Sequence, residues 1–288
     1  MRPSEVREIS YSDSAHSKAG RALIRSIENC TGRIGLIKRA ENYDKEIVRS
    51  GRNFWEVIVD RYHLDLEIVS GDVNTIPPKG PLVVVSNHPY GILDGLMLGY
   101  ILSQKRKDFR ILAHQVFKKS KELNKVILPI SFDETKEAAK QNIATRSVAL
   151  QHLKEGGCIG IFPGGTVSTA VKPFGKPMDP SWRRFTAKLV SKSEATVIPI
   201  FFYGSNSRLF QIASHIHYNL RMALLINEFK RRVDDKVMIS IGKSLPDSEL
   251  KNLRNDSNGL MDYLRIKTYG LSVDPKQEFD CGFEFQTD

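Results

Sequence analysis

Cysteine is scarce in this chain of 288 residues. The three cysteines, Cys30, Cys158 and Cys281, lie far apart, so they form neither the close pairs of a zinc knuckle nor the framework of a disulfide-stabilised domain. The simplest interpretation is an intracellular protein in a reducing compartment.

Long apolar runs are also missing. Asp94 and Pro199 interrupt the longest apolar stretches, and none reaches the ~18 residues that a helix needs to span a bilayer. The first residues, MRPSEVRE, contain acidic side chains and lead into no apolar segment, so we expect no secretory signal. We therefore expect any contact with a membrane to be peripheral.

Acidic residues are in deficit. The chain has 33 Asp and Glu against 43 Lys and Arg, a net charge of +10 and a pI near 9.4. This excess favours contact with an anionic surface or a polyanion. Hydrophobic residues at 41% and charged residues at 26% are ordinary for a globular protein and exclude disorder as the main state.

The first 64 residues have a helical pattern. Apolar residues recur at helical spacing over residues 18–39 among many lysines and arginines, although Gly32 and Gly35 are able to divide this helix in two. A second helix is expected within residues 43–62. We expect residues 1–64 to form a helical N-terminal arm that either packs on the core or lies among lipid headgroups.

Beyond residue 64, β-rich runs alternate with helical stretches. This alternation predicts an α/β domain over residues 65–245, with a mixed, mostly parallel sheet covered by helices on both faces, followed by a C-terminal surface segment, residues 246–288. The expected strands are 65–70, 82–86, 109–113, 126–130, 158–162, 196–203 and 236–241. The expected helices are 92–104, 133–154, 180–192 and 207–233.

His88 and Asp94 form the first motif with catalytic chemistry, in the segment VVVSNHPYGILDG. The histidine follows an expected buried strand, and the carboxylate comes six residues later, at the start of an expected helix. A turn that brings Asp94 back to His88 makes a general base whose imidazolium is stabilised by a carboxylate. The structural alternative is that His88 ends the strand and Asp94 caps the helix.

A glycine-rich loop forms the second motif. The segment IGIFPGGTVS places two adjacent glycines and two hydroxyl side chains just after an expected buried strand. Its backbone amides are suited to bind a phosphate or carboxylate, or to donate to the oxyanion of an acyl-transfer reaction. An ordinary tight turn is the alternative, because a Gly-Gly pair alone is weak evidence.

In this order the two motifs resemble the glycerolipid acyltransferase family, which includes the bacterial lysophosphatidic acid acyltransferases of PlsC type. That family carries Asn-His followed closely by Asp, and then a Phe-Pro-Glu-Gly-Thr-Arg-Ser block. Residues 197–200, Val-Ile-Pro-Ile, resemble its last motif, and residues 112–130 loosely match its acceptor-binding segment. The matching motif residues are Asn87, His88, Asp94, Phe162, Pro163, Gly165, Thr166 and Ser168.

The resemblance covers most of residues 65–245 and implies an acyltransferase-like α/β fold. It implies that His88 and Asp94 are the catalytic pair beside an acyl tunnel. The candidate oxyanion and acceptor loop is then Gly164, Gly165, Thr166 and Ser168, and the candidate acyl pocket is Pro199, Ile200 and Phe202 with the helix from Ile92.

The sequence departs from the family pattern at three points. His88 and Asp94 are one residue further apart than usual, which Gly91 is able to absorb. Gly164 stands in place of the Glu, and Val167 in place of the Arg that usually contacts the glycerol phosphate. A phosphate monoester favours an Arg fork, so its loss indicates a different or less charged acceptor. The family is understood to include acyltransferases for lyso-aminolipids such as lyso-ornithine lipid, and we favour that class.

A basic helix start suggests where an anionic headgroup binds. Asp179 and Pro180 predict the start of a helix, with Asp179 as its cap and Pro180 at its first position. This places Arg183 and Arg184 in a first turn where the helix dipole disfavours cations. A bound carboxylate or phosphate would explain them, and a solvated helix end is the alternative. The candidate acceptor or anion-binding residues are Asn87, His114, Lys172, Lys176, Arg183 and Arg184.

Other classes have less support. His114, His215 and His217 belong to no HExxH motif or carboxylate cluster, so we expect no metal. The absence of Gly-x-Ser-x-Gly argues against a serine hydrolase. The basic clusters 105–107, 118–119 and 230–232 lack the interleaved aromatic residues of a single-strand binder, so we expect no nucleic acid. Anionic lipid headgroups, or the phosphates of an acyl donor, explain these clusters better.

The sequence thus predicts a bacterial O-acyltransferase of membrane lipid biosynthesis. It would move a long-chain acyl group from acyl-CoA or acyl carrier protein, without a cofactor, to the hydroxyl of a lysolipid, preferably a lyso-aminolipid such as lyso-ornithine lipid. We expect it at the cytoplasmic side of the inner membrane. The alternatives are lysophosphatidic acid or another lysophospholipid as the acceptor, and a non-catalytic lipid-binding module that retains the fold.

Overall fold

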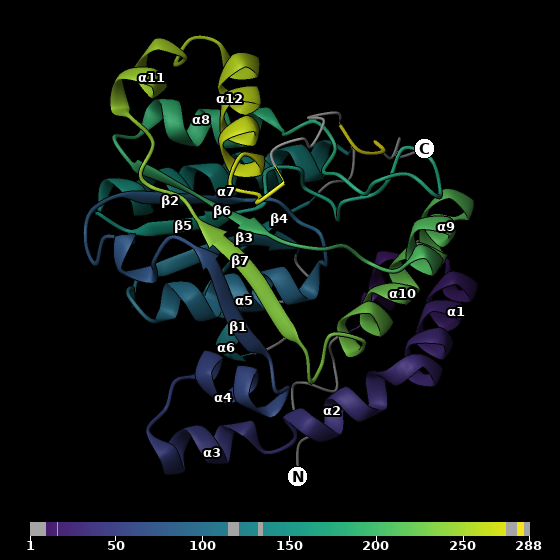
Figure 1. Cartoon of the computed structure of the whole chain (residues 1–288). Helices are drawn as coiled ribbons and strands as arrows, with labels where there is room; N and C mark the ends of the chain where they lie inside the picture. The colour runs from purple at the N-terminus through teal and green to yellow at the C-terminus, as the bar shows by residue number, and fades with distance from the viewer. Residues whose placement is uncertain (1–9, 16, 115–120, 132–134, 275–280, 285–288) are drawn as a thin grey trace.

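A single seven-stranded sheet organises the molecule (Figure 1). The computed structural model describes residues 10–15, 17–114, 121–131, 135–274 and 281–284. The strands follow the order β1-β7-β6-β2-β5-β3-β4, and every neighbouring pair is parallel except β6 and β7. Their bounds are β1 Asp65–Ser70, β2 Leu82–Ser86, β3 Phe109–His114, β4 Ile127–Ile130, β5 Cys158–Ile161, β6 Thr196–Phe202 and β7 Lys236–Ile241. The expected α/β fold with a mixed, mostly parallel sheet is confirmed.

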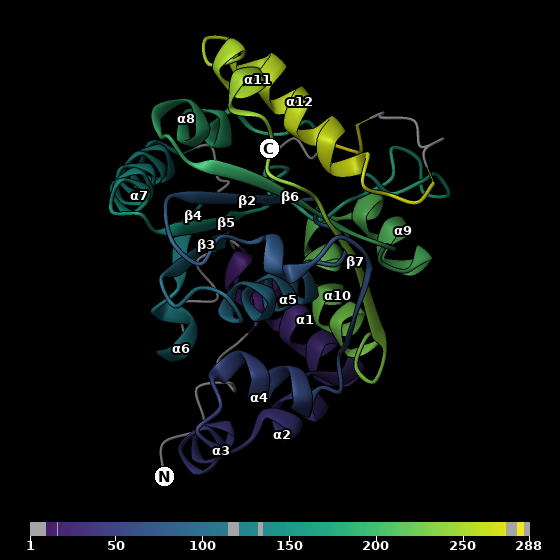
Figure 2. The same ribbon diagram turned by 60° about the vertical axis from the view of Figure 1, so that its left-hand side comes forward.

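Strand β2 shows how the sheet separates two cores. Leu82 and Val84 face one core, and Val83 and Val85 face the other. All four are fully buried, and each such aliphatic side chain stabilises the fold by about 1.5–3 kcal/mol. Figure 2 shows the helices in two layers on opposite sides of the sheet. One layer contains α5 (Ile92–Ser103) and α10 (Tyr218–Lys230); the other contains α7 (Lys136–Lys154), α8 (Arg184–Lys192), α11 (Asp247–Asn252) and α12 (Ser257–Tyr269).

The described part of the N-terminal arm consists mainly of short helices. They are α1 (Lys18–Glu28), α2 (Ile34–Ala40), α3 (Tyr43–Ser50) and α4 (Phe54–Arg61), and a π-helical turn, Asn29–Arg33, joins the first two. Gly32 has φ 139° in this turn, so it divides the helical pattern as expected. Helix α1 packs on α10 and buries Ile24 completely, whereas Leu23 stays exposed. Contact of this arm with a membrane stays a prediction.

Two expected helices have different bounds in the structure. The expected helix 207–233 is two helices, α9 (Arg208–Ile216) and α10, because His217 is extended and its Nδ1 accepts the N–H of Asn219, which starts the second helix. The expected helix 180–192 begins only at Arg184, so the prediction that Asp179 caps it is wrong.

Residues 246–288 were expected as a surface segment. Their described part includes α11 and α12, and α12 buries Leu260 and Leu264 completely against the sheet. The basic cluster 118–119 lies outside the described residues. Within the described part of the chain, every helix is too short or too polar to cross a bilayer.

Candidate active site

His88 and Asp94 meet where β2 ends and α5 begins. His88 Nδ1 lies 3.0 Å from Asp94 Oδ2, and the Asp94 side chain is completely buried. The same carboxylate oxygen accepts the backbone N–H groups of Tyr90 (2.8 Å) and Gly91 (2.9 Å). Asp94 therefore caps α5 with the same oxygen that lies beside the imidazole, so the structural interpretation is confirmed for this residue, and its catalytic role stays a prediction.

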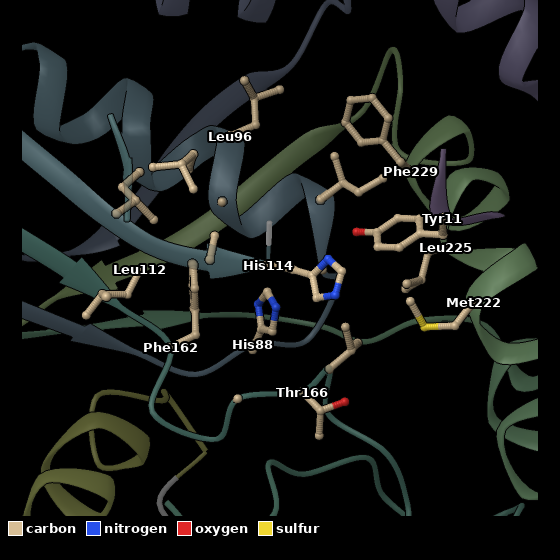
Figure 3. Close-up of a pocket in the computed structure, with 18 of the residues that line it drawn as sticks. Tyr11, His88, Leu96, Leu112, His114, Phe162, Thr166, Met222, Leu225 and Phe229 are labelled. Atoms are coloured by element: carbon tan, nitrogen blue, oxygen red, sulfur yellow. The ribbon is translucent and has the colours of Figure 1, made fainter. Parts of the chain in front are cut away.

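The orientation of His88 leaves one ring nitrogen for a substrate. Nδ1 faces Asp94, and the ring stacks on Phe162 with centroids 4.3 Å apart and planes at 24°. The ring lines the main cavity (Figure 3), which leaves Nε2 as the nitrogen able to exchange a proton with a bound molecule. Only 17% of the His88 side chain is exposed, so its surroundings strengthen electrostatic contacts.

The glycine-rich loop after β5 runs beside this histidine. The backbone N–H of Ser168 donates to the carbonyl of His88 over 2.8 Å. Gly165, Thr166 and Val167 line the cavity, whereas Gly164 and Ser168 do not. The N–H of Gly165 already donates to the carbonyl of Phe162 at 3.0 Å. Of the four expected loop residues, only Gly165 and Thr166 line the cavity, and Thr166 does so without this hydrogen bond.

Asp179 is a buried carboxyl that the sequence interpretation did not place in the site. Its Oδ1 accepts the backbone N–H of His88 (3.1 Å) and the hydroxyl of Ser168 (2.5 Å), and its Oδ2 accepts Trp182 Nε1 (2.9 Å). Burial raises the pKa of Asp179 above its ordinary value, against the opposing effect of these donors. A Cβ on Gly164 would lie 3.3 Å from Asp179, so glycine leaves the space for this carboxyl.

Arg221 is the second residue that sequence reasoning missed. It interrupts an apolar stretch of α10, and only 2% of it is exposed. Its guanidinium donates to the carbonyl of Val167 (2.8 Å) and to the hydroxyls of Thr166 (3.0 Å), Thr169 (2.6 Å) and Ser214 (2.9 Å). Burial lowers the pKa of Arg221 to about 9. The cation thus reaches the loop at Val167, the position where the family motif has its Arg.

A cavity of about 1160 Å³ extends from His88 between the helices. Its apolar wall comes from the N-terminal arm, α5, β3 and α10 (Figure 3). Gly95 in α5 lines it, and a Cβ there would meet no atom within 4 Å. The principal apolar lining residues are Leu36, Ile37, Phe54, Trp55, Ile58, Ile92, Leu96, Leu112, Phe162, Met222, Leu225, Ile226 and Phe229. Such a cavity is suited to an acyl chain.

Polar side chains also line this cavity. Arg183 and Arg184 are among them, and Arg184 Nε donates to Asn258 Oδ1 at 2.8 Å. Glu284 reaches the same lining from the C-terminal segment, where its Oε1 accepts the N–H of Ser181 at 3.1 Å. His114, at the end of β3, lines the cavity as well (Figure 3). The structure therefore brings three of the expected acceptor residues to the same cavity as His88.

The other expected binding residues lie elsewhere. The amide of Asn87 pairs with both backbone groups of Phe202 (2.7 and 2.8 Å), so it joins β2 to β6 rather than binding an anion. Lys172 and Lys176 are exposed and do not line the cavity. Pro199, Ile200 and Phe202 are buried in β6, between two other strands, and do not line it either. Of the expected acyl wall, only the helix that begins at Ile92 lines the cavity, and its contact with an acyl chain stays a prediction.

Comparisons with known proteins give matches to acyltransferases. The chain is 25% identical over 203 residues to a lyso-glycine lipid O-acyltransferase of Phocaeicola vulgatus, covering 68% of this chain and 70% of that protein. It is 25% identical over 204 residues to the protein of the same name from Bacteroides thetaiotaomicron, covering 68% and 71%. The crystal structure of the 1-acyl-sn-glycerophosphate acyltransferase PlsC from Thermotoga maritima aligns over 92% of this chain and 87% of that chain, with a TM-score of 0.47 and 16% identity.

The candidate active site lies inside the part of the chain that matches a protein-family model. The acyltransferase family model matches residues 32–278, which include His88, Asp94, the glycine-rich loop and Asp179. A buried carboxylate beside a histidine at the edge of an apolar cavity is suited to general-base chemistry on a bound apolar substrate. The chain belongs to the acyltransferase family and is an acyltransferase.

Proposed function

We propose that this acyltransferase transfers a long-chain acyl group from a thioester to the free hydroxyl of a lysolipid. The observation that carries the proposal is the His88–Asp94 pair, 3.0 Å apart, at a cavity with an apolar wall and charged residues in its lining. The apolar wall is suited to the acyl chain, and the charged residues are suited to a polar headgroup.

The chemistry begins at His88 Nε2, which accepts the proton of the acceptor hydroxyl as its oxygen attacks the thioester carbonyl. The buried Asp94 carboxylate stabilises the imidazolium that forms and fixes the ring through Nδ1. The oxyanion of the tetrahedral intermediate is stabilised by backbone N–H groups of the glycine-rich loop, with Thr166 as the principal candidate. Collapse of the intermediate breaks the C–S bond, and the thiolate takes the proton from the imidazolium.

We propose a lyso-aminolipid as the acceptor. Arg183 and Arg184 offer cationic groups to a headgroup carboxylate, and Glu284 offers an anionic group to an ammonium. Both curated relatives are lyso-glycine lipid O-acyltransferases, whose acceptor also carries an amino-acid headgroup. A lyso-ornithine lipid has both charges, so it fits the mixed lining better than a phosphate monoester does.

We predict the acyl donor and the cellular location of the enzyme from the positive charge of the chain. Basic clusters on the chain are suited to the phosphates of acyl-CoA and to the acidic surface of acyl carrier protein. A lysolipid acceptor resides in a membrane, so we propose that the protein acts peripherally on the cytoplasmic side of the inner membrane.

A mass-spectrometric assay tests the acceptor class. The purified protein is supplied with long-chain acyl-CoA or acyl carrier protein and, in separate reactions, with lyso-ornithine lipid, lyso-glycine lipid and lysophosphatidic acid. We expect a diacyl product from an aminolipid, at a higher kcat/KM than from lysophosphatidic acid. A higher kcat/KM for lysophosphatidic acid would contradict the proposal. Glu284→Gln should lower kcat/KM for lyso-ornithine lipid and leave that for lyso-glycine lipid unchanged.

A further inference from the structure

The loop of residues 170–177 exposes apolar side chains to solvent. Thr169 and Met178 close its base through an antiparallel bridge, with the Thr169 N–H donating to the Met178 carbonyl at 3.0 Å. Beyond this bridge, Phe174 is 77% exposed and Val171 is 58% exposed. Exposed apolar side chains that gather on one surface mark a candidate interaction site.

Both ends of this loop are bound to His88. Ser168, just before the loop, donates its N–H to the His88 carbonyl at 2.8 Å. Asp179, just after it, accepts the His88 N–H at 3.1 Å. Whatever binds the 170–177 loop is therefore held close to the catalytic histidine.

Helix α9 extends the same surface. Arg208 Nη1 donates to the carbonyl of Gly175 at 2.8 Å, and the side chain of Gln211 accepts the N–H of Ala170 at 3.0 Å. The neighbouring Leu209 is 57% exposed. Figures 1 and 2 both show α9 on one flank of the molecule. We call Val171, Phe174 and Leu209 the apolar patch.

The charge around the apolar patch is positive. Lys172 and Lys176 are exposed beside Phe174, and Arg208 precedes Leu209. Between Glu155 and Glu228 the only acidic residues are Asp179, which is fully buried, and Glu194. Glu284 adds one exposed carboxylate near the base of the loop, because the N–H of its neighbour Phe283 donates to the Thr169 carbonyl at 3.0 Å. Apolar side chains among cations, with few carboxylates, are complementary to a bilayer that has an anionic surface and an apolar interior.

We propose that the 170–177 loop and the start of α9 dock the enzyme on an anionic lipid bilayer. Phe174 and Val171 insert at the level of the acyl chains, and Lys172, Lys176 and Arg208 contact the headgroups. The docked loop holds the site at the surface where a lysolipid acceptor resides. The choice of a lipid bilayer as partner rests on the proposed function, but docking is measured without turnover.

Vesicle binding tests this surface. The double variant Val171→Ser with Phe174→Ser is compared with Ile143→Ser with Val148→Ser, which alters two residues of α7 that are 58% and 55% exposed. The loop variant should bind vesicles of phosphatidylglycerol and phosphatidylcholine about tenfold more weakly than the native protein. The α7 variant should bind like the native protein. Equal binding by the two variants would overturn the proposal.

Two further experiments test the contribution of the lysines to vesicle binding and the insertion of Phe174 into the bilayer. Lys172→Gln with Lys176→Gln should weaken binding to the same vesicles about 25-fold at low salt, with little effect on phosphatidylcholine alone. The added emission of Phe174→Trp should shift to shorter wavelength with vesicles, and that of Ile143→Trp should not. An unshifted emission from an active Phe174→Trp protein would contradict insertion. A loss of self-association in the loop variant, with native vesicle binding, would assign the patch to a second copy of the chain instead.

Turnover separates docking from chemistry. The Val171→Ser, Phe174→Ser variant should keep native turnover on detergent-dispersed lysolipid and lose turnover on lysolipid in vesicles. Loss in both assays would contradict a docking role. Vesicle binding that depends on the loop, in a protein that acylates no lysolipid, would overturn the proposed acceptor and leave the docking surface standing.

Discussion

The backbone N–H of His88 donates to the carboxylate of Asp179 over 3.1 Å, although the two residues are 91 positions apart in the chain. Through its other hydrogen bonds, the Asp179 side chain also holds Ser168 and Trp182. One buried side chain thus fixes the turn that carries the histidine against the glycine-rich loop. Asp179 is a positioning residue, because it acts on the site through His88 and Ser168.

Removal of the Asp179 side chain should destabilise the protein. In Asp179→Ala the donors of His88, Ser168 and Trp182 lose their acceptor, and each buried unpaired group costs about 1–3 kcal/mol. Asp179→Asn keeps an amide oxygen as an acceptor, so its free energy of unfolding should lie between those of Asp179→Ala and the native protein. Denaturant unfolding measures this order, and a native stability for Asp179→Ala would contradict the assigned role.

Asp179 should also give a pH dependence opposite to that of an ordinary carboxyl. Burial raises its pKa in the folded state above the ordinary value of 3.8. Its contribution is therefore fully present below pH 3.8 and is lost as pH rises through the folded pKa. The native protein should lose stability relative to Asp179→Asn over this window. Parallel stability curves for the two proteins, measured by unfolding from about pH 4 to about pH 8, would show that the carboxyl titrates normally.

Two glycines of α5 should respond differently to a side chain. A Cβ on Gly95 meets no atom within 4 Å in the cavity, whereas a Cβ on Gly99 would lie 2.2 Å from the Trp55 ring. Gly95→Leu should therefore keep a folded enzyme and lower kcat/KM for long acyl chains about tenfold more than for short ones. Gly99→Ala should instead lower stability, because the Trp55 ring must move to make room for the added methyl group. Competition between donors of two chain lengths measures the preference, and an unchanged preference in Gly95→Leu would place the acyl chain elsewhere.

Arg183 and Arg184 should affect the acceptor more than the donor. If they bind a headgroup carboxylate, Arg183→Ala and Arg184→Ala should raise the KM for the lyso-aminolipid about tenfold or more, since a charge-assisted hydrogen bond contributes about 1.5–3 kcal/mol. The KM for the acyl donor should stay unchanged. Lys188→Ala, a change in an exposed residue of the same helix, is the matched control. Unaltered acceptor KM and kcat in both arginine variants would exclude these residues from headgroup binding.

The parts of the site that the sequence predicted are those that local chemistry determines. His88 and Asp94 lie on either side of one turn, so a strand followed by a helix start was enough to bring them together. The glycine-rich loop was predicted because it follows a buried strand, and parallel strands of one sheet bring such ends to the same edge. The alternation of β-rich runs with helical stretches predicted the α/β fold, because each strand and helix is determined mainly by its own local pattern.

The parts that it did not predict depend on contacts across the chain. Arg221 donates to the carbonyl of Val167 from helix α10, 54 positions further along the chain. No motif spacing in the sequence predicts such a pair. Its position inside the apolar stretch of α10 was the available signal, because a buried cation needs partners. Asp179 was interpreted as a helix cap because Asp-Pro is a common helix start, but its burial directs the side chain inward to His88. Ile200 and Phe202 were expected in the acyl wall, and the central position of β6 places them in the core.

The catalytic pair is the central claim, and single-turnover acyl transfer tests it most directly. The rate of product formation from acyl-CoA and lyso-ornithine lipid is measured for the native enzyme, His88→Gln and Asp94→Asn, with retained unfolding transitions as the control for folding. In Asp94→Asn the amide oxygen still accepts the N–H groups of Tyr90 and Gly91, so α5 keeps its cap while the charge is lost. We predict that each variant forms product about 10²–10⁴-fold more slowly. A folded His88→Gln enzyme that forms product within about tenfold of the native rate would contradict the account.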